Sequence, residues 1–172
     1  MHFWKVLKNC QQCLKKLKNL ANNIMESHFT IKQITKFDKK VLLGINKILL
    51  QWSKTGYQMT PDYFASLITH SCVLVIYDKN DIIGTVTLVR IYKLSGLKGT
   101  IEHLIISEKY RGKGLGEKLM RHAIDLAKKL HIEKLFLTCD LDRVAANSLY
   151  QKLGFKIEKN NFYFLASEGN KI

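Results

Sequence analysis

The segment whose residue types point most directly to chemistry is a short turn rich in glycine and positive charge, Arg111-Gly112-Lys113-Gly114-Leu115-Gly116. A glycine-rich turn that opens a helix leaves backbone N–H groups unpaired, and the helix dipole adds partial positive charge where they converge. Glycine permits unusual backbone angles and removes side chains that would keep a ligand away from the main chain. The arginine and the lysine add charge-assisted donors. This pattern predicts a site for an anion such as a pyrophosphate.

Two common phosphate loops have a different spacing. A Walker A loop has Lys followed by Ser or Thr directly after its last glycine, whereas Glu117 and Lys118 follow Gly116 here. A dinucleotide-binding turn has the spacing G-x-G-x-x-G and an acidic residue at a set distance in the next strand. This chain has G-x-G-x-G without that residue. Both classes are therefore disfavoured, and a glycine-rich turn that binds nothing is the alternative left open.

Length, composition and charge narrow the class of protein. The chain has 172 residues, of which 47% are hydrophobic and 24% charged, which suits one globular domain. No apolar run approaches the roughly 20 residues of a membrane-spanning helix, so a transmembrane protein is not expected. The net charge of +14 favours polyanionic ligands. It does not distinguish nucleic acid, an anionic membrane and a phosphate-rich cofactor.

The cysteines indicate a reducing environment. Cys10, Cys13, Cys72 and Cys139 are scattered along a chain whose first residues lack the apolar stretch and cleavage site of a secretion signal. A cytoplasmic protein is therefore expected. Cys10 and Cys13 form a C-x-x-C pair, but no second Cys or His pair follows at the spacing of a zinc site. No metal is expected.

Hydrophobic periodicity predicts the elements that position the glycine-rich turn. Strands are predicted at 29–34, 73–77, 82–92, 100–106, 134–139, 155–157 and 162–165. Helices are predicted at 41–52, 115–130 and 143–153, and Thr60-Pro61 begins another that runs to about residue 68. Only the segment 100–139 has the strand-helix-strand order of a parallel crossover. The predicted fold class is therefore α/β (α+β) with a mixed sheet.

Residues 1–24 are predicted to form a basic amphipathic helix that is added to a complete domain, residues 25–172. Its apolar stripe and its lysines would suit contact with an anionic membrane surface. Packing on its own domain or on a second copy in a homodimer explains the same pattern and is favoured. Translation that starts at Met25 is a further alternative.

The chain resembles the GNAT superfamily of acyl-CoA-dependent N-acyltransferases. The central motif of that family runs from an apolar strand through R/Q-x-x-G-x-G/A into a helix, and it is matched by Leu104-Ile105-Ile106 followed by residues 111–116. A second family motif, A-x-x-L/F-Y-x-K-x-G-F, is matched by residues 146–155. The resemblance covers roughly residues 28–165. It implies a mostly antiparallel sheet of six to seven strands flanked by about four helices, plus the extra N-terminal helix.

The resemblance also implies acetyl-CoA as the co-substrate. The strand Leu104-Ile105-Ile106 is expected to bind its pantetheine arm through main-chain groups, and residues 111–116 its pyrophosphate through N–H groups. Many relatives have an Asn seven positions before the tyrosine of the second motif, where this chain has Arg143. Asn147, four residues later, is assigned this cofactor contact, and Arg143 is the alternative.

Acyl transfer from a thioester to an amine needs a neutral amine, a stabilised oxyanion and a proton for the departing thiolate. By resemblance, Tyr150 is the predicted general acid, and a packed tyrosine without that role is the alternative. Glu102 is the predicted base, because relatives have a carboxylate at this place on the strand; an exposed charge is an equal alternative. His103 alternates to the other face of the strand and is therefore the weaker base. An N–H group at a strand bulge near Ile105 is a candidate donor to the oxyanion.

The predicted function is transfer of an acetyl group from acetyl-CoA to a primary amine. A small-molecule amine is favoured as the acceptor, with a protein or peptide α-amine or lysine as the main alternative. A sensor that binds acyl-CoA without turnover is a rival from another class, and no specific nucleic acid partner is expected. Acceptor contacts are expected from residues 52–59 and 93–98, and the candidates that surround this pocket are Tyr57, Tyr63, Tyr92 and Lys93.

Overall fold

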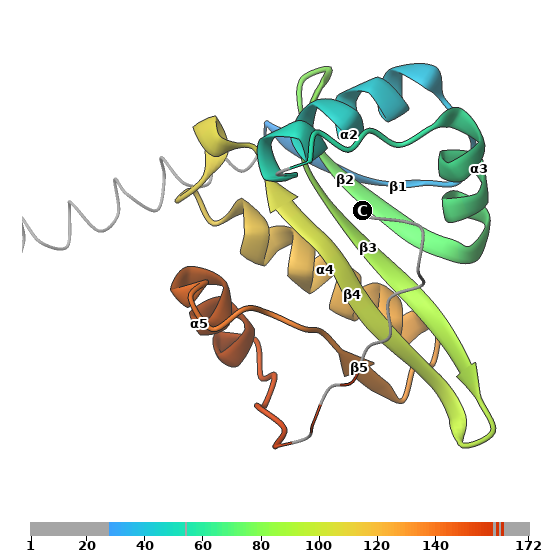
Figure 1. The fold of residues 1–172 in the computed structure, drawn as a ribbon, viewed down its shortest axis with the longest axis vertical. Helices are drawn as coiled ribbons and strands as arrows, with labels where there is room; N and C mark the ends of the chain where they lie inside the picture. Colours follow the sequence, from blue (N-terminus) through green and yellow to red (C-terminus); the bar gives the residue numbers. More distant parts are fainter. Residues whose placement is uncertain (1–27, 54, 160, 162, 164–172) are drawn as a thin grey trace, which may run out of the picture.

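The computed structural model describes residues 28–53, 55–159, 161 and 163. In this part of the chain five strands form one sheet, in the order β1-β2-β3-β4-β5 (Figure 1). The strands are β1 (Phe29–Ile34), β2 (Ser71–Asp78), β3 (Asp81–Lys93), β4 (Gly96–Ile106) and β5 (Lys134–Phe136). Neighbours are antiparallel except β4 and β5, which are parallel. The prediction of a mixed, mostly antiparallel sheet is therefore confirmed.

Four helices accompany the sheet in the described residues. They are α2 (Lys39–Trp52), α3 (Pro61–His70), α4 (Leu115–Lys129) and α5 (Val144–Lys152), and a short 3-10 helix, η1 (Glu108–Tyr110), precedes α4. The Asp38 carboxylate accepts hydrogen bonds from two N–H groups at the start of α2. The Thr60 hydroxyl accepts one from the Tyr63 N–H, and Pro61 is the first residue of α3. The start of a helix at Thr60-Pro61, predicted from residue type, is confirmed.

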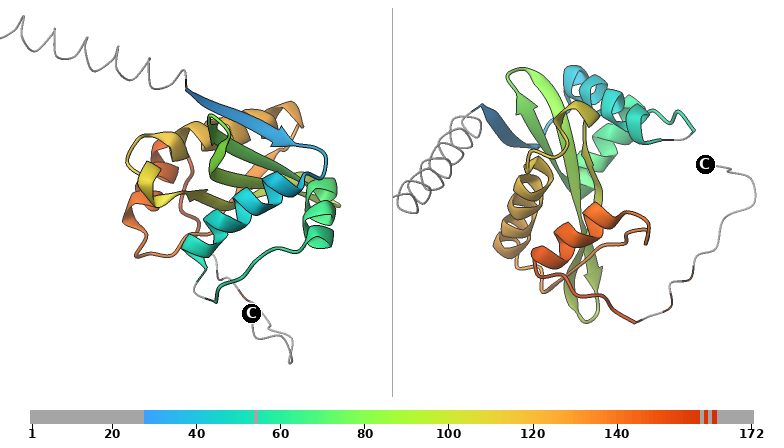
Figure 2. Two further views of the ribbon diagram at one scale, coloured as in Figure 1. Left: turned by 90° about the horizontal axis from the view of Figure 1, so that it is seen from above. Right: turned by 90° about the vertical axis from the view of Figure 1, so that its left-hand side faces the viewer.

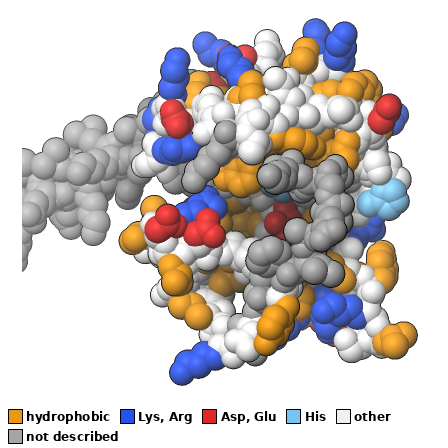
Figure 3. Space-filling view, viewed as in Figure 1, with side chains coloured by type: hydrophobic (Ala, Val, Ile, Leu, Met, Phe, Trp, Pro, Cys, Tyr) orange, Lys and Arg blue, Asp and Glu red, His pale blue; other side chains and the backbone are white. Residues whose placement is uncertain are grey.

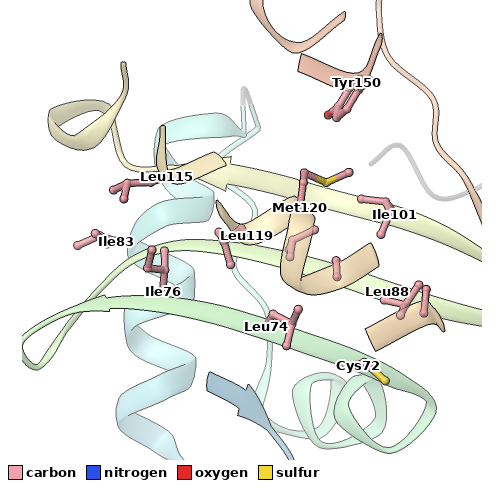
Figure 4. Packing of buried hydrophobic residues seen from close by; sticks show 13 residues of the cluster. Cys72, Leu74, Ile76, Ile83, Leu88, Ile101, Leu115, Leu119, Met120 and Tyr150 are labelled. Atoms are coloured by element: carbon pink, nitrogen blue, oxygen red, sulfur yellow. The ribbon is translucent and has the colours of Figure 1, made fainter. Parts of the chain in front are cut away.

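The helices form two layers, with α2 and α3 on one face of the sheet and α4 and α5 on the other (Figure 2). Strand alternation gives each layer its own core. On β2, Leu74 and Ile76 pack with α4, whereas Val73 and Val75 pack with α2 and α3. Figure 4 shows the α4 core, in which Leu119 and Met120 meet the strands. Full burial of such a side chain stabilises the fold by roughly 1.5–3 kcal/mol.

The strand count differs from the prediction at the C-terminal end. Residues 155–157 form no strand, because the Phe155 N–H donates to the Tyr150 carbonyl and the Gly154 N–H donates to the Gln151 carbonyl, which ends α5. The sheet therefore has five strands in the described residues rather than six to seven. The strand predicted at 134–139 ends at Phe136. The helix predicted at 1–24 and most of the strand predicted at 162–165 lie outside the described residues.

The positive charge is spread over the surface that Figure 3 presents. Lys and Arg side chains lie at several separate places on this face, with acidic side chains between them. In the described residues, no helix is long and apolar enough to cross a bilayer.

Candidate active site

A cavity lies where the parallel strands β4 and β5 separate. The two strands pair at only three positions, of which Thr100 with Phe136 is the last. Beyond this pair, β4 and the segment that follows β5 diverge and enclose a cavity of about 210 Å³. Its lining comes from β4, the segment after β5, α5 and the end of α2: Trp52, Ile101, Glu102, His103, Leu104, Ile105, Thr138, Cys139, Asp140, Arg143 and Tyr150.

A bulge in β4 shapes one wall of this cavity. On β3, Thr85 pairs with Ile105 and Thr87 pairs with Glu102, so two residues of β4 stand opposite the single residue between them. The extra residue exchanges the faces of the strand. Ile101 is buried in the core formed with α4, whereas Ile105, four residues on, is buried in the core formed with α2 and α3. In a regular strand, residues four apart would share a face.

The prediction that His103 lies on the opposite face of the strand from Glu102 is wrong, because of the bulge. The His103 backbone is in the left-handed region, with φ of 51°, so simple alternation does not apply to it. The imidazole lies edge-on to the ring of Trp52, with ring centroids 5.5 Å apart. His103 and Glu102 therefore line the same cavity instead of opposite faces. The predicted bulge exists, and its left-handed residue is His103, two positions before Ile105.

Glu102 lies on the cavity wall and is only partly exposed. One carboxylate oxygen, Oε1, accepts a hydrogen bond of 2.8 Å from the Thr100 hydroxyl. This bond fixes the carboxylate on the strand and leaves further lone pairs to accept a proton or a hydrogen bond. This geometry suits Glu102 to the role of general base, and that role stays a prediction.

Tyr150 forms the opposite wall. It lies between α5 and β4 (Figure 4), and only 7% of it is exposed. Its ring packs against the Phe155 ring at 6.1 Å between centroids. Burial raises the pKa of Tyr150 above its usual 10.0, neighbouring Cys139 raises it further, and Arg143 opposes the change. The hydroxyl therefore holds its proton at neutral pH, as a general acid must.

The predicted anion turn opens directly into α4. Gly112 and Gly114 both have φ of 74°, and a Cβ atom at either would meet nothing within 4 Å. Gly114 is the N-cap of α4, and no side chain caps this end of the helix. The backbone therefore requires glycine at two positions, and open space lies beside them. Gly116 differs from the prediction, because it is in the first turn of the helix with an ordinary φ.

The cations of the turn make contacts within the protein. Arg111 donates from Nε to the Ile106 carbonyl at 3.1 Å and lies 3.6 Å from the Glu108 carboxylate. The Lys113 ammonium lies 5.0 Å from the centroid of the Tyr110 ring. The Arg111 contact joins the turn to the end of β4, the strand whose residues 104–106 are predicted to bind the arm of the cofactor.

An ion-pair network holds α5 against the start of α4. Glu117, in the first turn of α4, accepts from Lys152 of α5 at 2.6 Å and from Arg121 at 2.7 Å. The hydrogen bonds from Lys152 and then Arg121 lower the pKa of Glu117 below its usual 4.5. The network connects the helix that carries Tyr150 to the helix that follows the glycine turn.

Asn147 is not in the lining of the cavity, whereas Arg143 is. The Asn147 side chain donates from Nδ2 to the carbonyls of Asp140 at 2.8 Å and Arg143 at 3.1 Å. It therefore closes the loop that leads into α5. Its assignment as a cofactor contact stays a prediction.

The predicted acceptor residues lie apart from the cavity, with the exception of Trp52. Tyr57, Tyr63 and Tyr92 are 43%, 56% and 76% exposed, so they belong to the surface and not to the core. Thr138 and Asp140 also line the cavity and were not predicted as site residues. Their position after a strand parallel to β4 was the available signal, because parallel strands end at the same edge of a sheet. No group of three potential metal ligands occurs in the described residues.

Residues 42–155 match the model of the acetyltransferase (GNAT) family. N-alpha-acetyltransferase 30 of Saccharomyces cerevisiae is 34% identical over 74 residues, which are 43% of this chain and 42% of that protein. The protein of the same name in Schizosaccharomyces pombe is 33% identical over 82 residues, 47% of this chain and 55% of that protein. The match thus spans about half the length of these relatives or less.

The fold is also similar to that of a solved structure. Glucosamine-6-phosphate N-acetyltransferase from Arabidopsis thaliana aligns with a TM-score of 0.68 over 81% of this chain and 99% of that chain. The sequences are 21% identical, so the similarity concerns the arrangement of strands and helices.

Proposed function

The chain belongs to the acetyltransferase (GNAT) family, and from this premise we propose that it transfers the acetyl group of acetyl-CoA to a primary amine. The observation that carries the proposal is the cavity between β4 and β5. It has a buried, protonated Tyr150 on one wall and the Glu102 carboxylate on the other. The amine would attack the thioester directly, without a covalent enzyme intermediate.

The residues of the turn before α4 fit the diphosphate of acetyl-CoA. An uncapped helix start offers backbone N–H groups and a partial positive charge to an anion. The space beside Gly112 and Gly114 is open to a ligand. In this proposal residues 111–116 hold the diphosphate and the strand Leu104-Ile105-Ile106 holds the arm. Bound acetyl-CoA supplies an acetyl thioester, whose carbonyl carbon accepts the amine.

The side chains of the cavity supply the proton transfers. Glu102 accepts a proton from the acceptor nitrogen, and Thr100 holds one oxygen of its carboxylate in place. Tyr150 donates its hydroxyl proton to the departing sulfur, which its raised pKa supports by keeping the hydroxyl protonated. A main-chain N–H near the bulge of β4 stabilises the oxyanion.

A second candidate narrows the acceptor to the α-amine of a peptide. The N-alpha-acetyltransferases of the two yeasts are more than 30% identical to this chain over the matched region. An α-amine also loses its proton about two to three pH units more readily than a lysine amine, so more of it is neutral at pH 7.

The test is amine-dependent release of the free thiol of coenzyme A. The purified protein would be incubated with acetyl-CoA and one of three amines: a short peptide with a free α-amine, the same peptide blocked at its N-terminus with one lysine, or glucosamine 6-phosphate. Thiol release that depends on one of them supports the proposal and identifies the acceptor class. Tight binding of acetyl-CoA without thiol release for any amine would favour the sensor instead.

A further inference from the structure

The bulge of β4 holds a histidine in a backbone conformation that disfavours most side chains. A non-glycine residue in the left-handed region is disfavoured, because its Cβ atom approaches the following carbonyl oxygen, and such residues gather at functional sites. The conformation of His103 is imposed from both sides, because Glu102 pairs with Thr87 and Ile105 pairs with Thr85. The buried Ile105 fixes the strand beyond the bulge. The pairing therefore fixes the position of the imidazole at the cavity.

The surroundings of this imidazole leave it able to accept a proton. The ring is exposed, and its nitrogens have no hydrogen-bond partner among the residues that the structure describes. Trp52, at the end of α2, contacts it edge-on and restricts its orientation. The titratable and charged groups that line the same cavity are Glu102 from β4, Cys139 and Asp140 from the segment after β5, and Arg143 and Tyr150 from α5 and its N-cap.

The chemistry of acetyl transfer needs more than one proton acceptor. A protonated primary amine carries three protons on nitrogen, and the amide product carries one. One proton must leave before the nitrogen can attack, and a second leaves as the tetrahedral adduct collapses. The sulfur takes a proton from Tyr150, which recovers one from the medium. The overall reaction thus releases one proton to solvent. Because two protons leave the nitrogen, two proton acceptors beside it suit the reaction better than one.

We propose that His103 accepts the first proton, from the ammonium group of the acceptor, and that Glu102 accepts the second. Trp52 is a positioning residue that holds the imidazole toward the cavity. The inference rests on the proposed acetyl transfer and adds a second base to it. His103 suits the first step, because its imidazole is held by Trp52 and His103 lines the same cavity as Glu102.

The test is chemical rescue in His103→Gly. Glycine adopts positive φ without strain, so this variant keeps the bulge and leaves a space where the ring was. With the free α-amine peptide, or whichever of the three amines the wild type acetylates, we expect kcat to fall about 100-fold, in the range of a lost general base. Added imidazole should restore at least a tenth of the wild-type rate. The dissociation constant of acetyl-CoA, measured by calorimetry, should stay within a factor of two.

His122→Gly is the matched control. His122 lies on the exposed face of α4 and contacts the Lys118 carbonyl, outside the cavity. The kcat of His122→Gly should not change when imidazole is added. The proposal is overturned if wild type is active while His103→Gly keeps full kcat, or if imidazole gives the same small acceleration in both variants. If the wild type acetylates none of the three amines, the proposed function is contradicted instead.

Trp52→Leu tests the positioning role of Trp52 separately from the proton transfer by His103. Loss of the edge contact should lower kcat several-fold, and imidazole should not restore it because the histidine is still present. A kcat equal to that of wild type would overturn the role given to Trp52.

Discussion

The backbone is left-handed at two places near the proposed site. Glycines occupy the first place, and a histidine with a bulky side chain occupies the second. In the turn before α4, Gly112 and Gly114 both have φ of 74°. In the bulge of β4, His103 has φ of 51°. The turn is left-handed because glycine there makes this conformation inexpensive. The bulge is left-handed because pairing with β3 on both sides leaves one residue too many.

The conformation of the turn is therefore determined by its own residues, whereas that of the bulge is determined by pairing within the sheet. A bulky residue should therefore damage the turn itself and the ligand that depends on it. The bulge should persist through many substitutions, because Ile105 and the β3 register keep it in place.

The largest effect is expected for Gly114→Val. Valine is β-branched and strongly disfavours φ of 74°, so the start of α4 must change and its N–H groups lose their arrangement. We expect the affinity for acetyl-CoA, measured by calorimetry, to fall by at least about 100-fold, as loss of several charge-assisted hydrogen bonds implies.

Gly56→Val controls for backbone strain in this experiment. Gly56 has φ of 70° and its Cβ would also meet nothing within 4 Å, but it lies in the loop between α2 and α3. The Gly56→Val variant should lose about as much stability as Gly114→Val and should bind acetyl-CoA with wild-type affinity. Equal affinities for the two variants would contradict the role of the turn.

Tyr150→Phe tests the cavity wall that faces the bulge. The ring contacts with Phe155 persist, and only the hydroxyl proton is lost. We expect kcat to fall about 100-fold or more and the affinity for acetyl-CoA to change little. Tyr77→Phe, a tyrosine that packs against the core of the other layer, should keep wild-type kcat. A fully active Tyr150→Phe would show that this hydroxyl is not the acid.

Substitutions at the bulge itself should show an inverted preference. In urea denaturation, His103→Val should be less stable than His103→Gly by about 1–2 kcal/mol, the cost of left-handed backbone. At Glu102, the neighbouring strand residue, the order should reverse, because glycine weakens an ordinary strand. The same order at both positions would mean that the bulge relaxes when its residue changes.

The smallest effect concerns alkaline stability. Burial raises the pKa of folded Tyr150 above 10.0, so above about pH 10 the unfolded chain loses this proton first. The free energy of unfolding should therefore fall as the pH rises through 10.0 toward the raised pKa of the folded hydroxyl. Tyr150→Phe should show a shallower fall, read from urea midpoints across this range. A steeper fall would contradict the burial of this hydroxyl.

Most of the fold could be predicted from the sequence, because the signals for its helices, strands and turns are local. Thr60-Pro61 starts a helix, alternation reveals the core strands, and Gly112 and Gly114 allow the turn before α4. The strand predicted at 134–139 ends at Phe136, because Thr138 and Cys139 line the opening between β4 and the following segment instead of pairing with β4. Phe155 likewise has apolar character, but its N–H serves the end of α5.

The parts of the site that depend on long-range pairing were harder to predict. The face assigned to His103 was wrong, because alternation assumes a regular strand and the bulge depends on the register with β3. Asp140 and Thr138 reach the cavity only because β5 and β4 separate after three pairs. Tyr150 and Glu102 were found through a family resemblance, and the structure places both at one cavity.

Calorimetric titration of the protein with acetyl-CoA at two temperatures tests directly whether the turn before α4 binds the diphosphate. Burial of apolar surface changes the heat capacity, so the enthalpy of binding cannot vanish at both temperatures. We expect saturable binding at one site, for which free coenzyme A competes. If no saturable heat appears at either temperature, the turn before α4 does not hold a diphosphate, and the proposed acetyl transfer is contradicted.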